Sequence, residues 1–274
     1  KTSMIRLPKT SKIPIKVPYD GYWQYLRNPE TLRNLAYGQS LETNEFTHEP
    51  LVNLTDLGIS NYSYEFEHNS YEDALRLLGH DVEFNKDVYV RKTVGELLVK
   101  IDQGLKSDGL HLHVRSGYRS PELQELAFLK TREKKGEDFA RSRYAVKGDL
   151  TGKEAIFPHA TGGTVDVELY CGNGLVKMKE EGMPVGVWDL EMLFSNDPRA
   201  EKFKKLKDIP EHWKDFLSAR RVLYHAMVDQ DNLEEKFVPI VTEYWHFSRG
   251  DFLSGVVAKL LGFDDYKPYY GLAV

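Results

Sequence analysis

The sequence predicts a single α+β domain with a small, mostly antiparallel sheet flanked by helices. Three observations support this fold class. Apolar and polar residues alternate at 110–118 and at 164–170, as expected for strands with one buried face. Apolar residues recur at helical spacing from 93 to 105 and from 210 to 228. The links between these segments are too irregular for repeated strand–helix–strand units, which favours antiparallel pairing.

The first half of the chain contains an arm, two helices and a strand. Residues 1–20 are basic and rich in proline, which predicts an extended N-terminal arm ahead of one domain over 21–274. A capping residue at Ser70 and a helix stop at Gly79 predict a short helix at 70–79. A stronger helix begins at Thr93, which forms a capping box with Glu96. The run 110–118 then reads as a strand.

The second half begins with a helix that Ser120 caps and Pro121 opens. Residues 131–157 are charged and punctuated by glycine, which predicts a long surface excursion. A strand follows at 164–170, then a helix from Pro210 to about residue 228. The aromatic and β-branched run 237–247 predicts a last strand.

Composition limits the classes of partner. Charged residues make up 29% of the chain, the net charge is −5, and Lys and Arg form no stripe, so nucleic acid is not expected as a partner. No apolar run is long enough for a membrane span. Cys171 is the single cysteine, so the chain forms no internal disulfide. The first residue is Lys1, which is compatible with a removed signal peptide, and the compartment stays open between cytoplasmic and periplasmic or secreted.

Two candidate metal ligands lie in the stretch FPHATGGTVDVELY, at 157–170. His159 and Asp166 are seven residues apart, so a straight strand would direct them to opposite faces. Gly162 and Gly163 lie between them and allow a tight turn that brings the two side chains together. The sequence therefore predicts a loop at these glycines.

A second pair of candidates lies in TEYWHF, at 242–247. Glu243 and His246 are three residues apart, an odd spacing that a regular strand would again split between its two faces. If both side chains reach one metal ion, the backbone between them must turn or bulge. A hydrolytic zinc site needs three ligands and a separate carboxylate that accepts a proton from water. His159, Asp166 and His246 fit the first role, and Glu243 fits the second.

Each of these segments also has a structural interpretation. A histidine beside a proline is commonly a packing residue, and an EYWHF run is commonly a core strand. His111 and His113 lie on one face of the strand at 110–118, where they either bind the metal or line the sheet. His212 and His225 are interpreted as surface or packing residues of a helix.

The two segments together resemble a known family. His159, Gly162 and Asp166, followed downstream by Glu243 and by Trp245 and His246, match the S-x-H-x-x-G-x-A-x-D and E-x-W-H pattern of the zinc D-alanyl-D-alanine peptidases. That family includes DD-carboxypeptidases and the vancomycin-resistance D-Ala-D-Ala dipeptidases. The stretch SGYRS is similar to the segment that carries the family arginine and places it at Arg119.

The resemblance implies a function for each matching residue. One zinc ion is bound by His159, Asp166 and His246, and activates water for attack on a peptide carbonyl. Glu243 is the general base that takes the proton and passes it to the leaving amine. Arg119 stabilises the developing oxyanion, a role worth about 3 kcal/mol in comparable sites.

Further stretches resemble the dipeptidase branch. The run LAYGQSLETNEF at 35–46 places Tyr37 in a substrate-facing position, and MPVGVWD at 183–189 places Asp189 where the substrate amino group binds. Asp189 is also well placed to cap a helix. Phe157 stands where the family has a substrate-facing serine, and Thr164 where it has alanine. The bulky Phe157 affects substrate specificity and leaves the metal ligands unchanged.

The sequence thus predicts zinc-dependent hydrolysis of dipeptides that contain D-amino acids, such as D-Ala-D-Ala, in cell-wall peptide metabolism. The expected partner is a small peptide substrate, and the oligomeric state stays open. The alternatives are a D,D- or L,D-carboxypeptidase acting on peptidoglycan stem peptides and a non-catalytic zinc-binding module of the same fold. An Fe(II) oxygenase also uses two histidines and one carboxylate, but the seven-residue gap and Glu243 do not fit that class.

Overall fold

The structure is a computed structural model, and it describes residues 7–13, 15, 49–59, 87–138, 140, 158–172, 174–183, 209–229, 236–240, 243–260 and 269–270. The helix predicted at 70–79 lies outside these ranges. The described elements, in chain order, are η1 (Lys9–Lys12), β1 (Leu51–Asn53), η2 (Leu54–Leu57), β2 (Tyr89–Arg91), α4 (Lys92–Lys106), β3 (Leu110–Ser116), α5 (Pro121–Lys135), η5 (Pro158–Thr161), β4 (Thr164–Cys171), β5 (Gly174–Leu175), α8 (Trp213–Val228), β6 (Val238–Pro239), β7 (His246–Ser248) and α9 (Phe252–Leu260).

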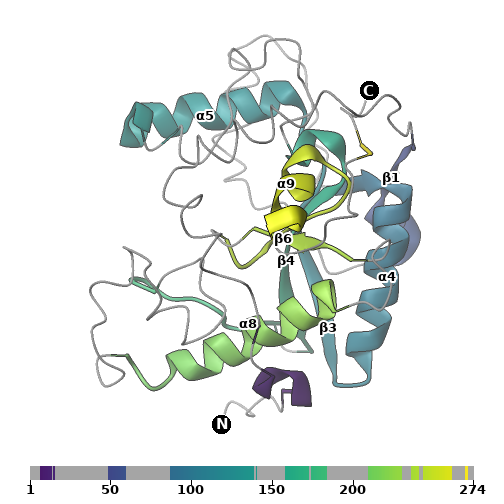
Figure 1. Ribbon diagram of the computed structural model, residues 1–274, viewed down its shortest axis with the longest axis vertical. Coiled ribbons are helices and arrows are strands. Elements are labelled where there is room, and N and C mark those ends of the chain that lie inside the picture. The colour runs from purple at the N-terminus through teal and green to yellow at the C-terminus, as the bar shows by residue number, and fades with distance from the viewer. Residues whose placement is uncertain are drawn as a thin grey trace.

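Two antiparallel sheets organise these elements (Figure 1). The larger one has five strands in the described part of the chain, ordered β3-β4-β7-β6, with β5 pairing to β4. Strands β1 and β2 form a separate two-stranded sheet. Helices flank these sheets, so the predicted α+β class is confirmed. The central strand of the larger sheet is β4, which pairs with β3 on one side and with β7 on the other.

The strand β4 has one apolar and one polar face. Val165, Val167 and Leu169 are fully buried in the core. Asp166 and Glu168 alternate with them, and successive side chains of a strand point to opposite faces. The two carboxylates therefore lie on the face opposite the apolar core, where a polar site can form.

The helix α4 forms where the apolar periodicity predicts it. Its apolar stripe includes Leu98 and Ile101, both buried, and the helix packs beside β3. The predicted capping box is wrong. The Thr93 hydroxyl donates instead to the Glu49 carboxylate, and Glu96 lies 3.8 Å from the ammonium of Lys92. A partner 44 residues away in the sequence thus replaces the local cap.

The helices α5 and α8 also agree with the sequence, with shifted ends. Ser120 caps α5 by accepting a hydrogen bond from the Leu123 amide at 3.2 Å, as predicted. The helix continues to Lys135, so the first part of the predicted excursion at 131–157 is helical. Helix α8 begins at Trp213, after a turn that starts at Pro210, and buries the predicted apolar residues.

Two segments expected to be extended contain turns. In the N-terminal arm, Lys9–Lys12 form the 3-10 helix η1, which packs on α8. Arg221 of α8 donates to the Ser11 carbonyl at 2.6 Å, and His225 lies 2.9 Å from the Ile13 carbonyl. The predicted strand at 237–247 is divided into β6 and β7. The contacts with α8 explain the helical turn in the arm, and the turn before β7 explains why the predicted strand is divided.

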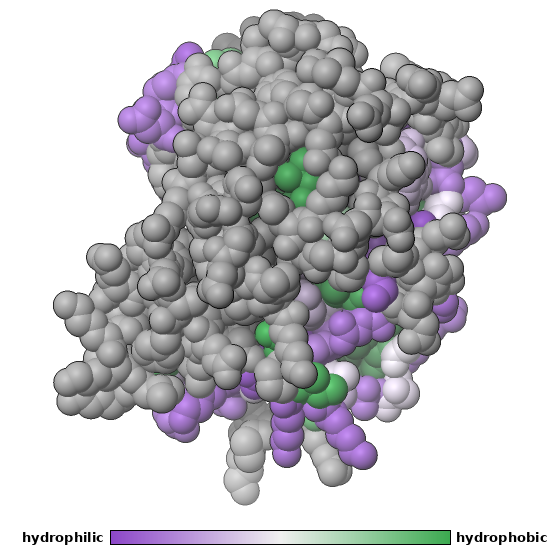
Figure 2. Space-filling view, viewed as in Figure 1, coloured by the Kyte–Doolittle hydropathy of each residue, from purple (hydrophilic) through white to green (hydrophobic). Residues whose placement is uncertain are grey.

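Apolar side chains of the described elements are mostly buried in the core. Three large ones are exposed in the described part of the chain, namely Ile13, Leu129 and Leu175. The hydrophobic areas visible in Figure 2 are small and separate from one another. Among the described residues, no helix combines the length and the apolar character that crossing a bilayer requires.

Candidate metal centre

His159 is positioned by a short helix and a tight glycine turn. It lies in η5 and is buried, and the chain then turns at Gly162, whose φ is +74°. Gly163 follows, and a Cβ atom there would lie 2.1 Å from the Arg249 carbonyl oxygen. A side chain is therefore excluded at Gly163 and disfavoured at Gly162. The predicted loop between the two candidate ligands is confirmed, and β4 begins directly after it.

His246 is positioned by a turn that begins at Glu243. The Glu243 amide donates to the Ile240 carbonyl at 3.1 Å, and the His246 amide donates to the Glu243 carbonyl at 3.2 Å. These bonds take the backbone out of strand geometry, as the odd spacing predicts. Strand β7 then begins at His246, which pairs directly opposite Asp166 of β4.

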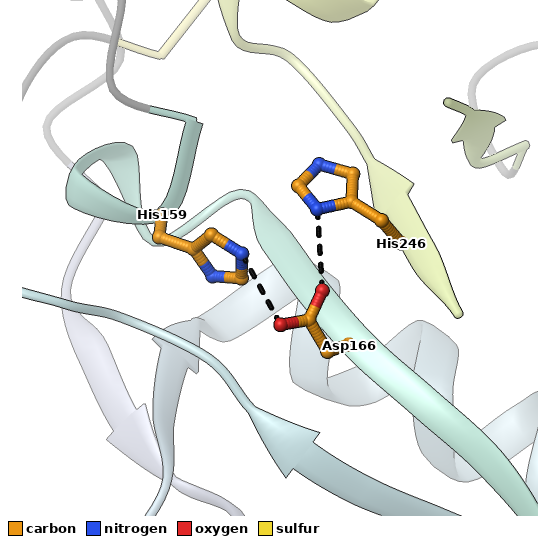
Figure 3. A group of neighbouring side chains, drawn as sticks. All are labelled: His159, Asp166 and His246. Atoms are coloured by element: carbon orange, nitrogen blue, oxygen red, sulfur yellow. Dashed lines mark ion pairs between the residues drawn. The ribbon is translucent and has the colours of Figure 1, made fainter. Parts of the chain in front are cut away.

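The three side chains converge on one point (Figure 3). His159 Nε2 lies 3.5 Å from Asp166 Oδ2, and His246 Nδ1 lies 3.2 Å from Asp166 Oδ1. One ligand atom from each residue lies within 4.8 Å of the other two. Ligand bonds to zinc are about 2 Å long, so two ligand atoms of one ion lie at most about 4 Å apart, and both contacts of Asp166 with the imidazoles are within that distance.

The hydrogen bond on the far side of the His159 ring decides which of its nitrogens faces the cluster as an acceptor. His159 Nδ1 lies 2.8 Å from the carbonyl oxygen of Gly117, which can only accept. The neutral ring therefore carries its proton on Nδ1 and presents the Nε2 lone pair to Asp166. Metal-binding histidines commonly have such a partner on the other nitrogen.

Among the described residues, one carboxylate oxygen of Asp166 also lacks a hydrogen-bond donor. Its Oδ1 atom is buried and makes no hydrogen bond within the described part of the chain, although His246 Nδ1 lies 3.2 Å away. A buried carboxylate oxygen in this situation is costly unless a cation satisfies it. Two imidazoles and one carboxylate are a common donor set for zinc. The residues present therefore fit a bound metal ion.

The electrostatics of the cluster follow from its burial and its mixed charges. Burial lowers the pKa of His159, and the positive charge of Arg119 contributes to that shift. Burial alone would raise the pKa of Asp166, but the two neighbouring imidazoles hold it well below its usual range. Burial opposes protonation of His246, yet Asp166 and Glu243 together raise its pKa. The carboxylate is thus ionised, as a metal ligand must be.

Glu243 and Arg119 lie beside the cluster in different ways. Glu243 Oε2 is 4.0 Å from His246 Nδ1, and its side chain is 26% exposed. Arg119 is buried, and its guanidinium donates to Gln124 Oε1 at 2.8 Å and to Ser116 Oγ at 3.2 Å. Its backbone amide donates to the His159 carbonyl at 3.1 Å, which ties this residue to the first ligand.

The other histidines named from the sequence have partners elsewhere. His113 is buried and stacks on Tyr170, with ring centroids 6.4 Å apart. His111 lies 3.4 Å from Asp102. On α8 and the turn before it, His225 lies 2.5 Å from Asp229, and His212 lies 2.6 Å from Glu180. Among the described residues, the group that could hold a metal ion includes none of these four histidines.

The three predicted substrate-binding residues, Tyr37, Phe157 and Asp189, lie outside the described residues. Conversely, the structure places three residues behind His246 that the sequence did not suggest as part of the site, namely Thr164, Ser248 and Asp251. In the sequence, Thr164 stands out only as a departure from the family pattern. No spacing rule links these positions, because they meet through strand pairing.

Comparisons with known proteins include a distant structural similarity. No family model matches the chain, and no curated protein matches it. Among solved structures, the chain is similar to LdcB, an LD-carboxypeptidase whose structure is described as revealing the basis of peptidoglycan recognition. The TM-score is 0.35 and the identity 18%, over 81% of this chain and 78% of that one. This similarity is too remote to assign an activity.

Proposed function

We propose that this chain is a zinc-dependent peptidase that hydrolyses dipeptides containing D-amino acids, such as D-Ala-D-Ala, in cell-wall peptide metabolism. The observation that carries the proposal is the convergence of His159, Asp166 and His246, with the Glu243 carboxylate 4.0 Å from the ring nitrogen of His246 that faces the cluster. A purely structural zinc site has no use for such a carboxylate, whereas a hydrolytic site requires one.

Each residue has a defined part in the proposed reaction. His159 Nε2, Asp166 and His246 Nδ1 would hold the ion, which would lower the pKa of water and polarise a peptide carbonyl. The Glu243 carboxylate, partly exposed beside the ligands, accepts a proton from the attacking water. The same carboxyl group then delivers this proton to the amine that leaves.

Arg119 stabilises the negative charge that develops on the carbonyl oxygen. Its guanidinium is held in place by Gln124 and Ser116, so the group is oriented before substrate binds. A donor fixed in advance contributes more than one that must reorganise during the reaction. After burial, which is the larger cause, the positive charge of Arg119 also lowers the pKa of His159.

The choice of zinc and of a D-amino-acid dipeptide follows from the resemblance of the motif to the zinc D-alanyl-D-alanine peptidases. Two alternatives share the same residues. A D,D- or L,D-carboxypeptidase would accept a longer stem peptide at the same site. A non-catalytic module would bind zinc and hydrolyse nothing. The length and the stereochemistry of the peptide that is cut distinguish these three possibilities.

The proposal is tested by metal analysis combined with product analysis. The purified protein is assayed for zinc content and incubated with D-Ala-D-Ala, with a pentapeptide ending in D-Ala-D-Ala, and with a peptide containing an L,D bond. We expect one zinc per chain and release of D-alanine from the dipeptide, measured by mass spectrometry. Cleavage of the pentapeptide or of the L,D peptide instead would support a carboxypeptidase. One bound zinc per chain with no cleavage of any peptide would support the non-catalytic zinc-binding module.

A further inference from the structure

A chain of hydrogen bonds connects His246 to a buried carboxylate behind it. His246 Nε2 lies 3.2 Å from Ser248 Oγ, and Ser248 Oγ lies 3.0 Å from Thr164 Oγ1. Thr164 Oγ1 in turn donates to Asp251 Oδ2 at 3.0 Å. Strand pairing creates this chain, because Thr164 lies opposite Ser248 just as Asp166 lies opposite His246. The four residues joined by these hydrogen bonds are all buried.

Asp251 is fixed at the far end of the chain by helix α9. The residue directly precedes the helix, and its Oδ1 atom accepts a hydrogen bond from the Ser254 amide at 2.8 Å, as a capping residue does. Its backbone carbonyl accepts from the Gly255 amide at 3.1 Å. One carboxylate oxygen therefore caps the helix, and the other is left to accept from Thr164.

The direction of each of these hydrogen bonds follows from the carboxylate of Asp251, at one end of the series. A carboxylate oxygen accepts, so the single hydroxyl proton of Thr164 points to Asp251. Thr164 must then accept from Ser248, which uses the only proton of the Ser248 hydroxyl. Ser248 must in turn accept from His246, so Nε2 of that ring carries the proton. In the neutral ring, the Nδ1 lone pair then faces Asp166 and Glu243.

We propose that Asp251, Thr164 and Ser248 are positioning residues that fix His246 in the Nε2–H tautomer, so that Nδ1 is preset as the metal ligand. This inference rests on the metal site of the proposed function. It concerns residues that do not touch the metal, and the family pattern has alanine where this chain has Thr164. Partners in this position commonly contribute a factor of 10–100 to metal affinity.

Replacing one carboxylate oxygen of Asp251 with an amide nitrogen is expected to reverse the direction of each hydrogen bond between Asp251 and His246. In Asp251→Asn the carbonyl oxygen of the amide still accepts from the Ser254 amide, so the helix cap is kept. The amide NH₂ group then faces Thr164 and donates to it. Thr164 would donate to Ser248, and Ser248 to His246 Nε2, which moves the ring proton to Nδ1. The metal ligand atom would thus be blocked by a proton without loss of any side chain.

The test combines a tautomer measurement with a zinc affinity. Long-range ¹H–¹⁵N NMR of the metal-free protein, at a pH where the imidazole is neutral, reports which nitrogen of His246 carries the proton. Competition with a chelator gives the Kd for zinc. We expect Nε2–H in the unmodified protein and Nδ1–H in Asp251→Asn, with zinc binding 10–100-fold weaker in the variant. An Nδ1–H tautomer in the unmodified protein would overturn the inference, as would an unchanged tautomer or zinc affinity in Asp251→Asn.

Three further variants make the result specific. Thr164→Ser keeps the hydroxyl and should match the unmodified protein in both measurements. Asp229→Asn makes the same chemical change beside His225 and should leave His246 unaffected. Should Asp251→Asn fail to fold, Thr164→Val removes the hydroxyl link and should weaken zinc binding where Thr164→Ser does not. The tautomer is read without metal or substrate, so an absence of peptidase activity would count against the proposed function alone.

Discussion

At the scale of single residues, the candidate site depends on what each side chain can donate or accept. Both oxygens of Asp166 face an imidazole, and the Gly117 carbonyl accepts the Nδ1 proton of His159. Glu243 differs from these three residues because its carboxylate is partly exposed and is not one of the converging ligand atoms. A carboxylate that is close to the ion but not bound to it can exchange protons with water and substrate.

Replacing Glu243 separates proton transfer from metal binding. In Glu243→Gln the side chain keeps its size and loses its basicity, so we expect zinc content to stay at that of the unmodified protein. For the peptide that the unmodified protein cleaves in the assay proposed above, kcat should fall by about 10²–10⁴, the usual contribution of a general base. The measurements are zinc content and steady-state kinetics.

A matched control for that variant is Glu211→Gln. Glu211 is exposed and pairs with Lys214 on the surface, so both kinetics and zinc content should stay unchanged. Unaltered turnover in Glu243→Gln would mean that another group accepts the proton.

At the scale of secondary structure, the site depends on two interruptions of regular elements. One is the glycine turn between η5 and β4, and the other is the turn that leads into β7. Both were expected, because the odd spacings would otherwise divide the candidate ligands between two faces. The capping box at Thr93 was not realised, because the hydroxyl found a partner in Glu49, far away in the sequence.

Adding a methyl group at Gly163 tests the first of these turns. A Cβ atom there would lie 2.1 Å from the Arg249 carbonyl oxygen and 2.8 Å from the Tyr270 ring. We expect Gly163→Ala to destabilise the fold by about 1–3 kcal/mol, the usual cost of overpacking, or by more if the backbone cannot move. Zinc affinity should fall as well, because the start of β4 carries Asp166. Chemical unfolding and chelator competition measure the two effects.

Gly172 provides the comparison for that variant. It follows β4 directly, and a Cβ atom there would meet nothing within 4 Å. Gly172→Ala should therefore change the free energy of unfolding by less than about 0.5 kcal/mol. If the two alanine variants were equally stable, the close approach of Arg249 would not be what requires glycine at position 163.

At the scale of the whole molecule, the cluster joins segments that are far apart in the sequence. The ligands come from η5, β4 and β7, and α9 holds the chain of hydrogen bonds behind them. A bound ion would therefore add a crosslink between elements that strand pairing and packing already bring together. Metal binding and global stability should be linked in this protein.

Zinc is expected to raise the thermal stability of the chain. A ligand that binds only the folded state at 100 times its Kd adds about 2.7 kcal/mol to the free energy of unfolding. We expect an increase of several degrees in Tm on zinc addition, reversed by a chelator and measured by calorimetry. His246→Ala lacks one ligand and should show little or no increase. An equal increase in that variant would place the stabilising ion elsewhere.

The sequence by itself determined the fold class, the course of α4, α5, α8, β3 and β4, and the residues that converge in the cluster. Periodicity predicts these elements because they bury one apolar stripe or face, a local property of the chain. The family motif and the odd spacings of His159–Asp166 and Glu243–His246 predict the cluster and the turns that form it.

Only the tertiary structure decided how the ligands are held. The partners that orient the two imidazoles, Gly117 for His159 and Ser248 with Thr164 and Asp251 for His246, come together through strand pairing and helix packing. Hydrogen bonds between residues more than 80 positions apart leave no periodic trace in the sequence. The direction of a ring proton depends on such contacts, so it can be inferred only after the chain has folded.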